Sequence, residues 1–301
     1  MKVGLMAPQG WKGEYDGWEP AEAWARTIEL AEQAEELGFE SLWVFDHFHT
    51  VPEPTDEITF ESFSVLSALA MATRRVRIGH MVVCSGFRNP AYTAKLSSTI
   101  DVISGGRFEL GIGAGWKEDE WIAYGYGFPP IGERLDAFGD HLEVITRMFA
   151  PGHATYEGRY AHVRDAINVP KGLQKPRIPI IVGGNGQRRT AGYAIKYADE
   201  LNFVFLRADE VAARMVQVRE RCDAEGRDPA TLRFSLYAKD EEMRDAGQAR
   251  VDALGAYREV GLDRIVCFPT RWAPTTDAQE AFADDVRAAG IHLAAGEAVS
   301  A

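Results

Sequence analysis

An aspartate–histidine pair is the first group in the chain that could carry chemistry. Asp46 and His47 directly follow an apolar segment, residues 41–45. A histidine beside a carboxylate can take up or release a proton near neutral pH. The pair is therefore a candidate acid–base site, in which His47 exchanges the proton and Asp46 either orients the imidazole or binds backbone. A histidine satisfied by ordinary hydrogen bonds is the structural alternative.

A second histidine opens another interpretation of the same segment. His47 and His49 have the spacing of a metal-binding pair, which raises a metal-dependent hydrolase as an alternative. Such a site needs further histidine or aspartate ligands from later strands. The later apolar segments end instead in Gly183, Leu206 and Pro269-Thr270, so we predict no metal site.

A glycine-rich turn is a candidate anion site. Residues 178–190 run from an apolar segment through Gly183-Gly184-Asn185-Gly186 into a pattern typical of a helix. Glycines leave backbone amides free to face an anion at a helix start, and Arg188 or Arg189 could add positive charge. Phosphate binding is therefore a hypothesis, with a tight strand-to-helix turn as its alternative.

The elements that position these residues follow a regular pattern. Eight short runs of branched and aromatic residues alternate with stretches of helical period, which is typical of βα units around a parallel sheet. The predicted strands cover residues 2–7, 41–45, 77–83, 107–112, 178–182, 201–206, 232–237 and 264–268. Units of about 38 residues favour a (β/α)8 TIM barrel that takes up residues 1–301 as a single domain. A doubly wound sheet is the main rival, but its usual glycine fingerprint is missing after the first strand.

Two connections are longer than the barrel requires. Residues 114–130, after the fourth predicted strand, form an aromatic-rich insertion that either lines a pocket or packs on the rim or on a partner subunit. Residues 151–176, before the fifth strand, contain a predicted small hairpin around Gly158.

Composition limits the class of partner and the compartment. The chain has 33 basic and 45 acidic side chains, a net charge of −12, which argues against a nucleic acid or an anionic membrane as partner. Its three cysteines, Cys84, Cys222 and Cys267, are far apart, which fits a reducing compartment, so we expect a cytoplasmic protein. No stretch approaches the roughly 18 apolar residues of a spanning helix.

Four segments together resemble a known family. They are Phe45-Asp46-His47-Phe48; residues 78–83 leading to Phe87-Arg88-Asn89-Pro90; residues 104–116, SGGRFELGIGAGW; and residues 178–184, IPIIVGG. In this order and at these strand ends they resemble the luciferase-like monooxygenase family, from the first strand to the last helix. The resemblance implies a (β/α)8 barrel that binds a flavin or a deazaflavin at its mouth. An Asp-His pair after strand two is typical of the subgroup that uses the deazaflavin coenzyme F420, whereas bacterial luciferases tend to carry Glu-His-His there.

The resemblance also implies roles for single residues. A bulge after strand three, often with a non-prolyl cis peptide, supports the tricyclic ring in family members and maps to Met81-Val82. The Gly183-Gly184 turn would hold the cofactor phosphate, and His47 would be the general acid or base. The full set of implied cofactor contacts is Met81, Val82, Gly113, Ala114, Gly115, Gly183, Gly184, Asn185, Gly186 and Arg188.

The predicted reaction is hydride transfer between C5 of the deazaflavin and a small organic substrate, with His47 supplying or removing the balancing proton. We expect the pocket walls to come from Met6, Trp43, Val82, Trp116 and the aromatic insertion. Arg271 would meet an anionic substrate or the cofactor tail, or else form a surface ion pair.

The same resemblance limits the substrate and leaves other functions open. Sugar-phosphate dehydrogenases of the subgroup have a glutamate where this chain has Trp116, and Glu118 and Glu120 are displaced from that position, so a sugar phosphate is disfavoured. A reduced-FMN-dependent monooxygenase is the main alternative function, and a non-catalytic flavin-binding barrel is another. A homodimer is the family expectation.

Overall fold

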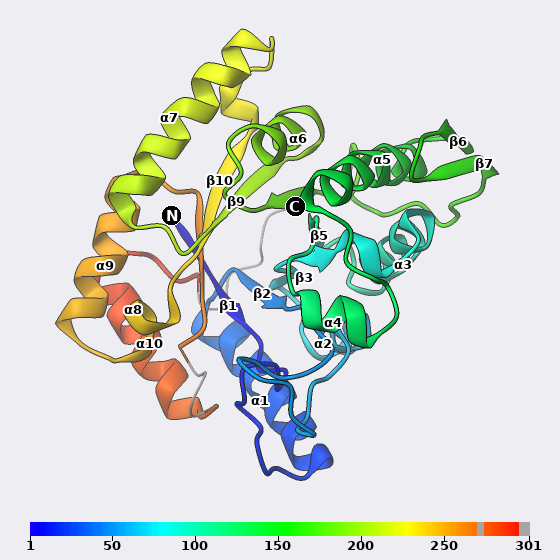
Figure 1. The fold of residues 1–301 in the computed structure, drawn as a ribbon. Coiled ribbons are helices and arrows are strands. Elements are labelled where there is room, and N and C mark those ends of the chain that lie inside the picture. The colour runs from blue at the N-terminus through cyan, green and yellow to red at the C-terminus, as the bar shows by residue number, and fades with distance from the viewer. Residues whose placement is uncertain (270–273, 295–301) are drawn as a thin grey trace.

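Eight parallel strands close into a barrel in the computed structural model (Figure 1). In chain order they are β1 (Lys2–Met6), β2 (Ser41–Val44), β3 (Arg77–His80), β5 (Phe108–Gly113), β8 (Ile180–Gly183), β9 (Glu200–Val204), β10 (Arg233–Tyr237) and β11 (Arg264–Cys267). Each pairs with the next, β1 pairs with β11, and the β3–β5 pairing completes the ring. The structure describes residues 1–269 and 274–294. The predicted (β/α)8 barrel is confirmed, and the doubly wound alternative is wrong.

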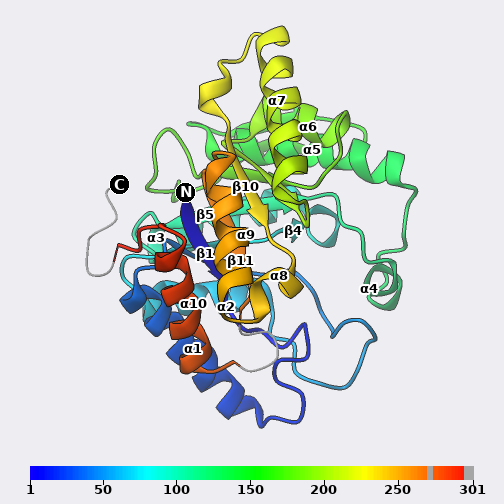
Figure 2. The same cartoon turned by 90° about the vertical axis from the view of Figure 1, so that its left-hand side faces the viewer.

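Helices surround the barrel (Figures 1 and 2). They are α1 (Pro20–Leu37), α2 (Ser62–Ala72), α3 (Pro90–Ile103), α5 (Ile131–Phe149), α6 (Arg189–Tyr197), α7 (Ala208–Ala224), α9 (Gln248–Glu259) and α10 (Thr276–Ala288). The sequence sets their ends locally. Helix α1 begins at Pro20, whose fixed φ suits a first turn, and stops at Gly38, whose φ of 91° is a left-handed conformation that glycine adopts readily.

Shorter elements lie in the connections. They are β4 (Val83–Cys84), α4 (Glu118–Ala123), the hairpin of β6 (Ala154–Glu157) and β7 (His162–Ala166), α8 (Asp240–Arg244), and the 3₁₀ turns η1 (Ser85–Phe87) and η2 (Pro229–Thr231). The hairpin falls within the predicted insertion before strand β8, and its strands are antiparallel. Helix α4 lies in the aromatic insertion after β5 and matters for the site, because it returns acidic side chains toward the barrel mouth.

An ion network closes the barrel at the amino-terminal ends of its strands. The buried guanidinium of Arg264 lies 2.8 Å from Glu109, 3.1 Å from Glu200 and 3.0 Å from Glu40. Burial would raise the pKa of the Glu109 carboxyl, but Arg264 and Arg77 reverse this effect and hold the pKa low. With Arg233, which pairs with Glu200 at 3.2 Å, three guanidiniums balance the three carboxylates. Binding and chemistry in such barrels take place at the opposite, carboxyl-terminal end.

Candidate active site at the barrel mouth

The carboxyl ends of the strands surround a cavity of about 600 Å³, which we call the inner cavity. The sequence-predicted residues that line it are Asp46, His47, Met81, Val82, Gly113, Ala114, Gly115, Trp116, Gly183, Gly184 and Gly186. The peptide bond between Met81 and Val82 is cis, as predicted. The structure therefore brings the predicted acid–base pair and the predicted glycine turn to one cavity.

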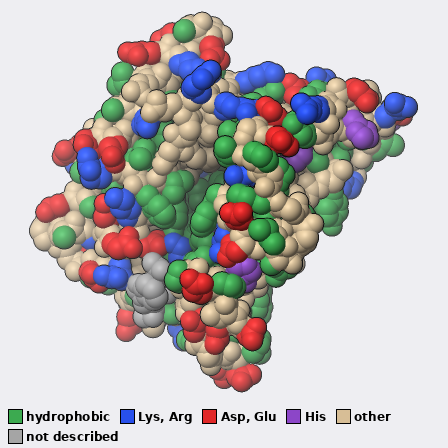
Figure 3. Space-filling view, in the orientation of Figure 1, with side chains coloured by type: hydrophobic (Ala, Val, Ile, Leu, Met, Phe, Trp, Pro, Cys, Tyr) green, Lys and Arg blue, Asp and Glu red, His purple; other side chains and the backbone are tan. Residues whose placement is uncertain are grey.

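A second cavity, of about 940 Å³, adjoins the first, and we call it the outer cavity. The two cavities share Trp11, Trp116, Lys117 and Phe205 as wall residues. The space-filling view shows the molecule hollowed here, with hydrophobic side chains in the hollow (Figure 3). Because the walls are shared, a ligand in the inner cavity would meet one in the outer cavity.

A glutamate from helix α4 fixes the imidazole of His47. Nδ1 of His47 lies 2.7 Å from Oε2 of Glu120, which is fully buried, and Oε1 of Glu120 accepts a hydrogen bond from the Phe48 amide at 3.0 Å. An ionised carboxylate only accepts hydrogen bonds, so opposite an ionised Glu120 the Nδ1 of His47 carries the hydrogen. In this tautomer a neutral His47 has its lone pair on Nε2, where the ring can accept a proton.

Two tryptophans hold the imidazole ring in place. The Trp11 ring stacks on that of His47 with centroids 3.9 Å apart and planes 2° apart, and Trp116 meets it edge-on at 5.8 Å. These contacts, together with Glu120, leave the imidazole little freedom to rotate. A fixed base costs less conformational entropy when a substrate binds than a mobile one.

The side chain of Asp46 does not orient His47, because its hydrogen bonds go to other residues. It accepts hydrogen bonds from the Arg88 guanidinium at 2.7 and 2.9 Å, from the Cys84 amide at 2.9 Å and from the Ser62 hydroxyl at 2.9 Å. Of the two roles considered for Asp46, the structure shows backbone binding, through the Cys84 amide, and adds an ion pair with Arg88 that was not predicted. We correct its assignment from catalytic residue to structural support of the strand end that carries His47.

Electrostatics fit this structural role of Asp46. Burial alone would raise the pKa of the Asp46 carboxyl, but the charge of Arg88 and the hydrogen bonds from Arg88 and Ser62 together lower that pKa below its ordinary value. The carboxylate thus remains ionised within an ion pair. It joins the end of β2 to the start of helix α2 and to β4.

The glycine turn only partly matches its predicted role. Gly183, Gly184, Gly186 and the helix residue Thr190 line the inner cavity where α6 begins. The Gly184 amide, however, donates to the Asn202 carbonyl at 2.9 Å. An anion would therefore meet the amides farther along the turn and the hydroxyl of Thr190.

The other residues predicted for this turn face elsewhere. The Asn185 amide group exchanges hydrogen bonds with the backbone of Val204, at 2.8 and 3.0 Å, and so ties the turn to β9. Arg189 pairs with Asp136 of α5, and Arg188 is exposed. Neither Asn185 nor Arg188 lines the inner cavity.

Comparison with known proteins identifies the family. The model of the luciferase-like monooxygenase family matches residues 1–290. The chain belongs to the luciferase-like monooxygenase family.

Relatives within the luciferase-like family include more than one chemistry. The chain is 31% identical over 189 residues to an F420-dependent glucose-6-phosphate dehydrogenase of Kineococcus radiotolerans, with 62% of this chain and 53% of that protein covered. It is 28% identical over 257 residues to the pyrimidine monooxygenase RutA of Serratia proteamaculans, with 80% of this chain and 68% of that protein covered. The matches thus span a little over half the length of the dehydrogenase.

A solved structure supports the fold. The structure of an F420-dependent secondary alcohol dehydrogenase, in complex with an F420-acetone adduct, matches with a TM-score of 0.79 over 96% of this chain and 98% of that chain. The sequence identity is 19%. This likeness shows that the luciferase-like barrel described above is shared.

Three residues predicted for the substrate pocket need correction or fall outside the structure. Met6 and Trp43 are buried inside the barrel, and the indole N–H of Trp43 donates to Ser41 at 2.9 Å. They lie in the strands themselves, below the mouth, and line neither cavity. Arg271 lies outside the described residues.

The sequence prediction missed Glu120, Trp11 and Phe205. Glu120 had been set aside as displaced, yet it lies four residues after Trp116, and the first turn of α4 brings it back to His47. That helical spacing was the available signal. Trp11 and Phe205 follow strands β1 and β9, so their positions at strand ends could also have indicated them.

Two kinds of feature are absent from residues 1–269 and 274–294, the part of the chain that the structure describes. Within these ranges, no group of three or more His, Cys, Asp and Glu side chains is arranged as metal ligands would be. In the same ranges, none of the helices has the length and apolar character needed to cross a bilayer.

Proposed function

We propose that this protein is an F420-dependent oxidoreductase that transfers a hydride between the deazaflavin and a small organic substrate. The observation that carries the proposal is a histidine, fixed by a buried glutamate, on the wall of a glycine-lined cavity at the barrel mouth. The named F420-dependent dehydrogenases among the relatives support the choice of cofactor.

The inner cavity fits a flat tricyclic ring. Its volume of about 600 Å³ lies within the range of small-molecule sites. A Cβ on Gly113 would lie 3.1 Å from the Val82 side chain, and one on Gly183 would lie 2.9 Å from it. Glycines at these two positions therefore leave room for the Val82 side chain, which lines the inner cavity as an apolar support for a ring.

Each part of the site then has a role. A bound deazaflavin would supply or accept a hydride at C5. His47 would take the substrate's proton on Nε2 in one direction and return it in the other. Glu120 would keep Nδ1 protonated and stabilise the positive charge that His47 gains. The apolar walls would exclude water from the reacting atoms.

A reduced-FMN-dependent monooxygenase is the second candidate, favoured by the RutA match over 80% of this chain. A deazaflavin lacks N5 and reacts poorly with oxygen, so the two candidates differ in whether oxygen is consumed. A non-catalytic flavin-binding barrel would have no use for the His47–Glu120 pair, which speaks against that alternative.

A binding titration tests the cofactor. The purified protein is titrated with oxidised F420 and, separately, with FMN, while tryptophan fluorescence is followed. We expect F420 to quench the fluorescence, because Trp11, Trp116 and Trp121 line the inner cavity, and we expect a micromolar or lower Kd. Micromolar FMN binding without F420 binding would contradict the proposal.

We also expect the protein to be a cytoplasmic homodimer. Exposed apolar residues gather on α3 and on the segment beside it: Tyr92, Val102, Ile167, Val169 and Leu173. Lys95 of α3 donates to the Val169 carbonyl and Asp101 accepts from the Leu173 amide, so the segment lies along the helix. We propose that this face joins two copies in a homodimer. The free, buried cysteines suit a cytoplasmic protein.

A further inference from the structure

The outer cavity has apolar walls where a substrate would lie. Trp11, Val51, Pro52, Trp116, Ile122 and Phe205 contribute to them. At the opening, Trp116 is 65% exposed, Ile122 59% and Phe205 42%. Large apolar side chains left this exposed around a cavity mark a binding surface for an apolar molecule.

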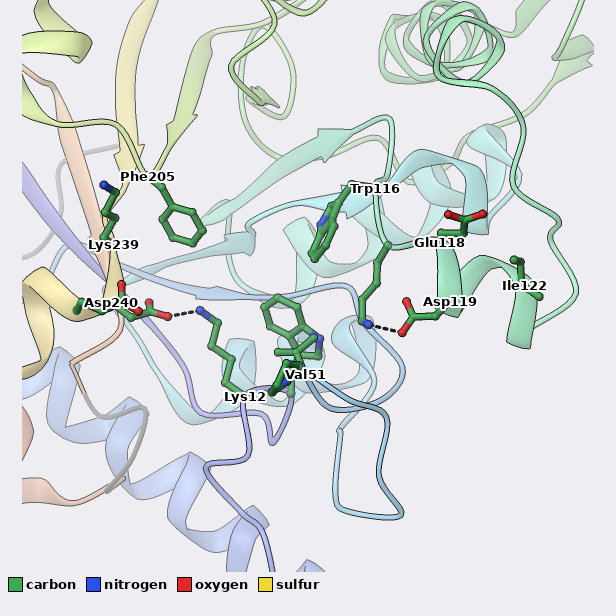
Figure 4. A pocket seen from close by; sticks show the side chains of 13 residues that line it. Lys12, Val51, Trp116, Glu118, Asp119, Ile122, Phe205, Lys239 and Asp240 are labelled. Atoms are coloured by element: carbon green, nitrogen blue, oxygen red, sulfur yellow. Dashed lines mark hydrogen bonds and ion pairs between the residues drawn. The ribbon is translucent and has the colours of Figure 1, made fainter.

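Phe205 has an unfavourable backbone conformation. Its φ is 58°, in the left-handed region that a bulky side chain rarely adopts. Its amide donates to the Tyr237 carbonyl at 2.9 Å, and the two rings lie 5.2 Å apart. This backbone places the Phe205 ring at the opening, opposite Trp116 (Figure 4). Unfavourable backbone of this kind concentrates at ligand sites.

Two of the three lysines that line this cavity are held in ion pairs. Lys12 forms a buried ion pair with Asp240, and the Lys117 ammonium lies 2.5 Å from Asp119 (Figure 4). The rim also carries Lys239, but together with Glu118 and Glu241. A phosphate dianion would have to break these pairs or lie near carboxylates, and sugar hydroxyls would face apolar walls without partners.

We propose that the outer cavity selects an uncharged, mainly apolar, ring-bearing alcohol or ketone, gripped between Phe205 and Trp116. This inference rests on the proposed function, because the inner cavity must hold the deazaflavin. In the oxidising direction, the carbinol carbon gives up a hydride to the oxidised deazaflavin. The hydroxyl proton passes to Nε2 of His47, and the ketone is released with the cofactor reduced by two electrons.

Two probes test the substrate class on the intact protein. 1-Tetralol and glucose 6-phosphate are each supplied with oxidised F420, and reduction of the cofactor is followed by its absorbance. Saturable quenching of tryptophan fluorescence by each probe is measured on the F420-bound protein. We expect kcat/KM to be at least about tenfold higher for 1-tetralol. A preference for glucose 6-phosphate, or neither turnover nor saturable quenching with 1-tetralol, overturns the inference.

A substitution isolates the role of the Phe205 ring. Phe205→Asn removes the ring but suits the left-handed backbone better, so thermal stability should stay unchanged or rise. The KM for 1-tetralol should rise about tenfold, and the Kd for F420 should rise much less, because Phe205 is one of many residues that line the inner cavity. Val216→Asn, on the exposed surface of α7, is the control and should leave KM unchanged.

The outcomes separate this inference from the proposed function. An unchanged KM in Phe205→Asn would show that the ring has only a structural role, and would overturn the proposal that it contacts the substrate. A rise in the Kd for F420 as large as the rise in KM would show that Phe205 serves mainly the cofactor, and would also overturn the inference. If wild-type protein binds F420 but prefers glucose 6-phosphate, the substrate class is wrong and the proposed function stands. If it does not bind F420, the proposed function itself fails.

Discussion

At the scale of single residues, the site depends on which side chain each charged group faces. His47 faces Glu120, which comes from 73 residues further along the chain, and Asp46 faces Arg88 from 42 residues away. Adjacency in sequence suggested that Asp46 and His47 act together. The two side chains instead have separate partners, because neighbouring residues at a strand end point in different directions.

Replacing Glu120 by glutamine should change the tautomer of His47. The amide can still accept from Phe48, but its NH2 group would then donate to Nδ1 and leave the hydrogen on Nε2. We expect kcat for substrate oxidation to fall about 100-fold, with an unchanged Kd for F420. Steady-state kinetics and titration check this. Glu133→Gln, exposed at the start of α5, is the control; equal kinetics for both variants would remove Glu120 from the mechanism.

Replacing Asp46 by asparagine should lower the stability of the folded protein. Arg88 would keep its buried position without its closest carboxylate, so the free energy of unfolding at pH 7 should fall by about 3 kcal/mol. Urea unfolding measures this, with exposed Asp56→Asn as the control.

The Asp46→Asn loss should also depend on pH. Because the pKa of Asp46 is lowered in the folded protein, its contribution is complete above its unfolded pKa, near pH 4, and disappears as the pH falls through the folded value. The gap between wild type and variant should therefore narrow in acid. A gap that is absent at pH 7, or that widens in acid, would contradict the structural role.

At the scale of elements, the junction of β8 and α6 carries the test of cofactor binding. Thr190→Val keeps the shape of the second residue of α6 but removes a hydroxyl from the inner cavity. We expect the Kd for F420 to rise about fivefold, the typical effect of one lost hydrogen bond. Thr99→Val, exposed on α3, should leave it unchanged. Equal Kd values for Thr190→Val and wild type would show that the anion lies elsewhere.

Elements also show why some predictions held and others did not. The strand ends were predictable because hydrophobic period and glycine placement mark them locally. They indicated that His47, Val82 and Gly183 lie at the barrel mouth, and the structure places all three on the inner cavity. The depth of a residue along its strand was not predictable from sequence. Met6 and Trp43, which were predicted for the pocket wall, are buried inside the barrel below the mouth. Helix α4 was not predicted because it is only six residues long and lies among aromatic residues that suggested a loop. Its acidic first turn, Glu118 to Glu120, was the signal of a helix start.

At the scale of the whole molecule, the chain carries a net charge of −12, but the charged side chains at the two ends of the barrel form local ion pairs. Repeated βα units predicted the closed barrel, but not how charges pair across it. The barrel bottom is neutralised around Arg264, and the cavity lysines Lys12 and Lys117 are each paired with an aspartate. Long-range pairs of this kind cannot be read from sequence spacing. They leave a mouth whose walls are mainly apolar.

Hydride transfer to F420 without oxygen is tested most directly in a sealed anaerobic cuvette. The protein and oxidised F420 are mixed with a panel of alcohols that includes glucose 6-phosphate, and loss of the oxidised cofactor's absorbance is recorded. In parallel, reduced FMN and the same panel are followed with an oxygen electrode. We predict anaerobic F420 reduction by at least one alcohol, abolished by His47→Ala. No F420 reduction by any of them, with substrate-dependent oxygen uptake from reduced FMN, would contradict it.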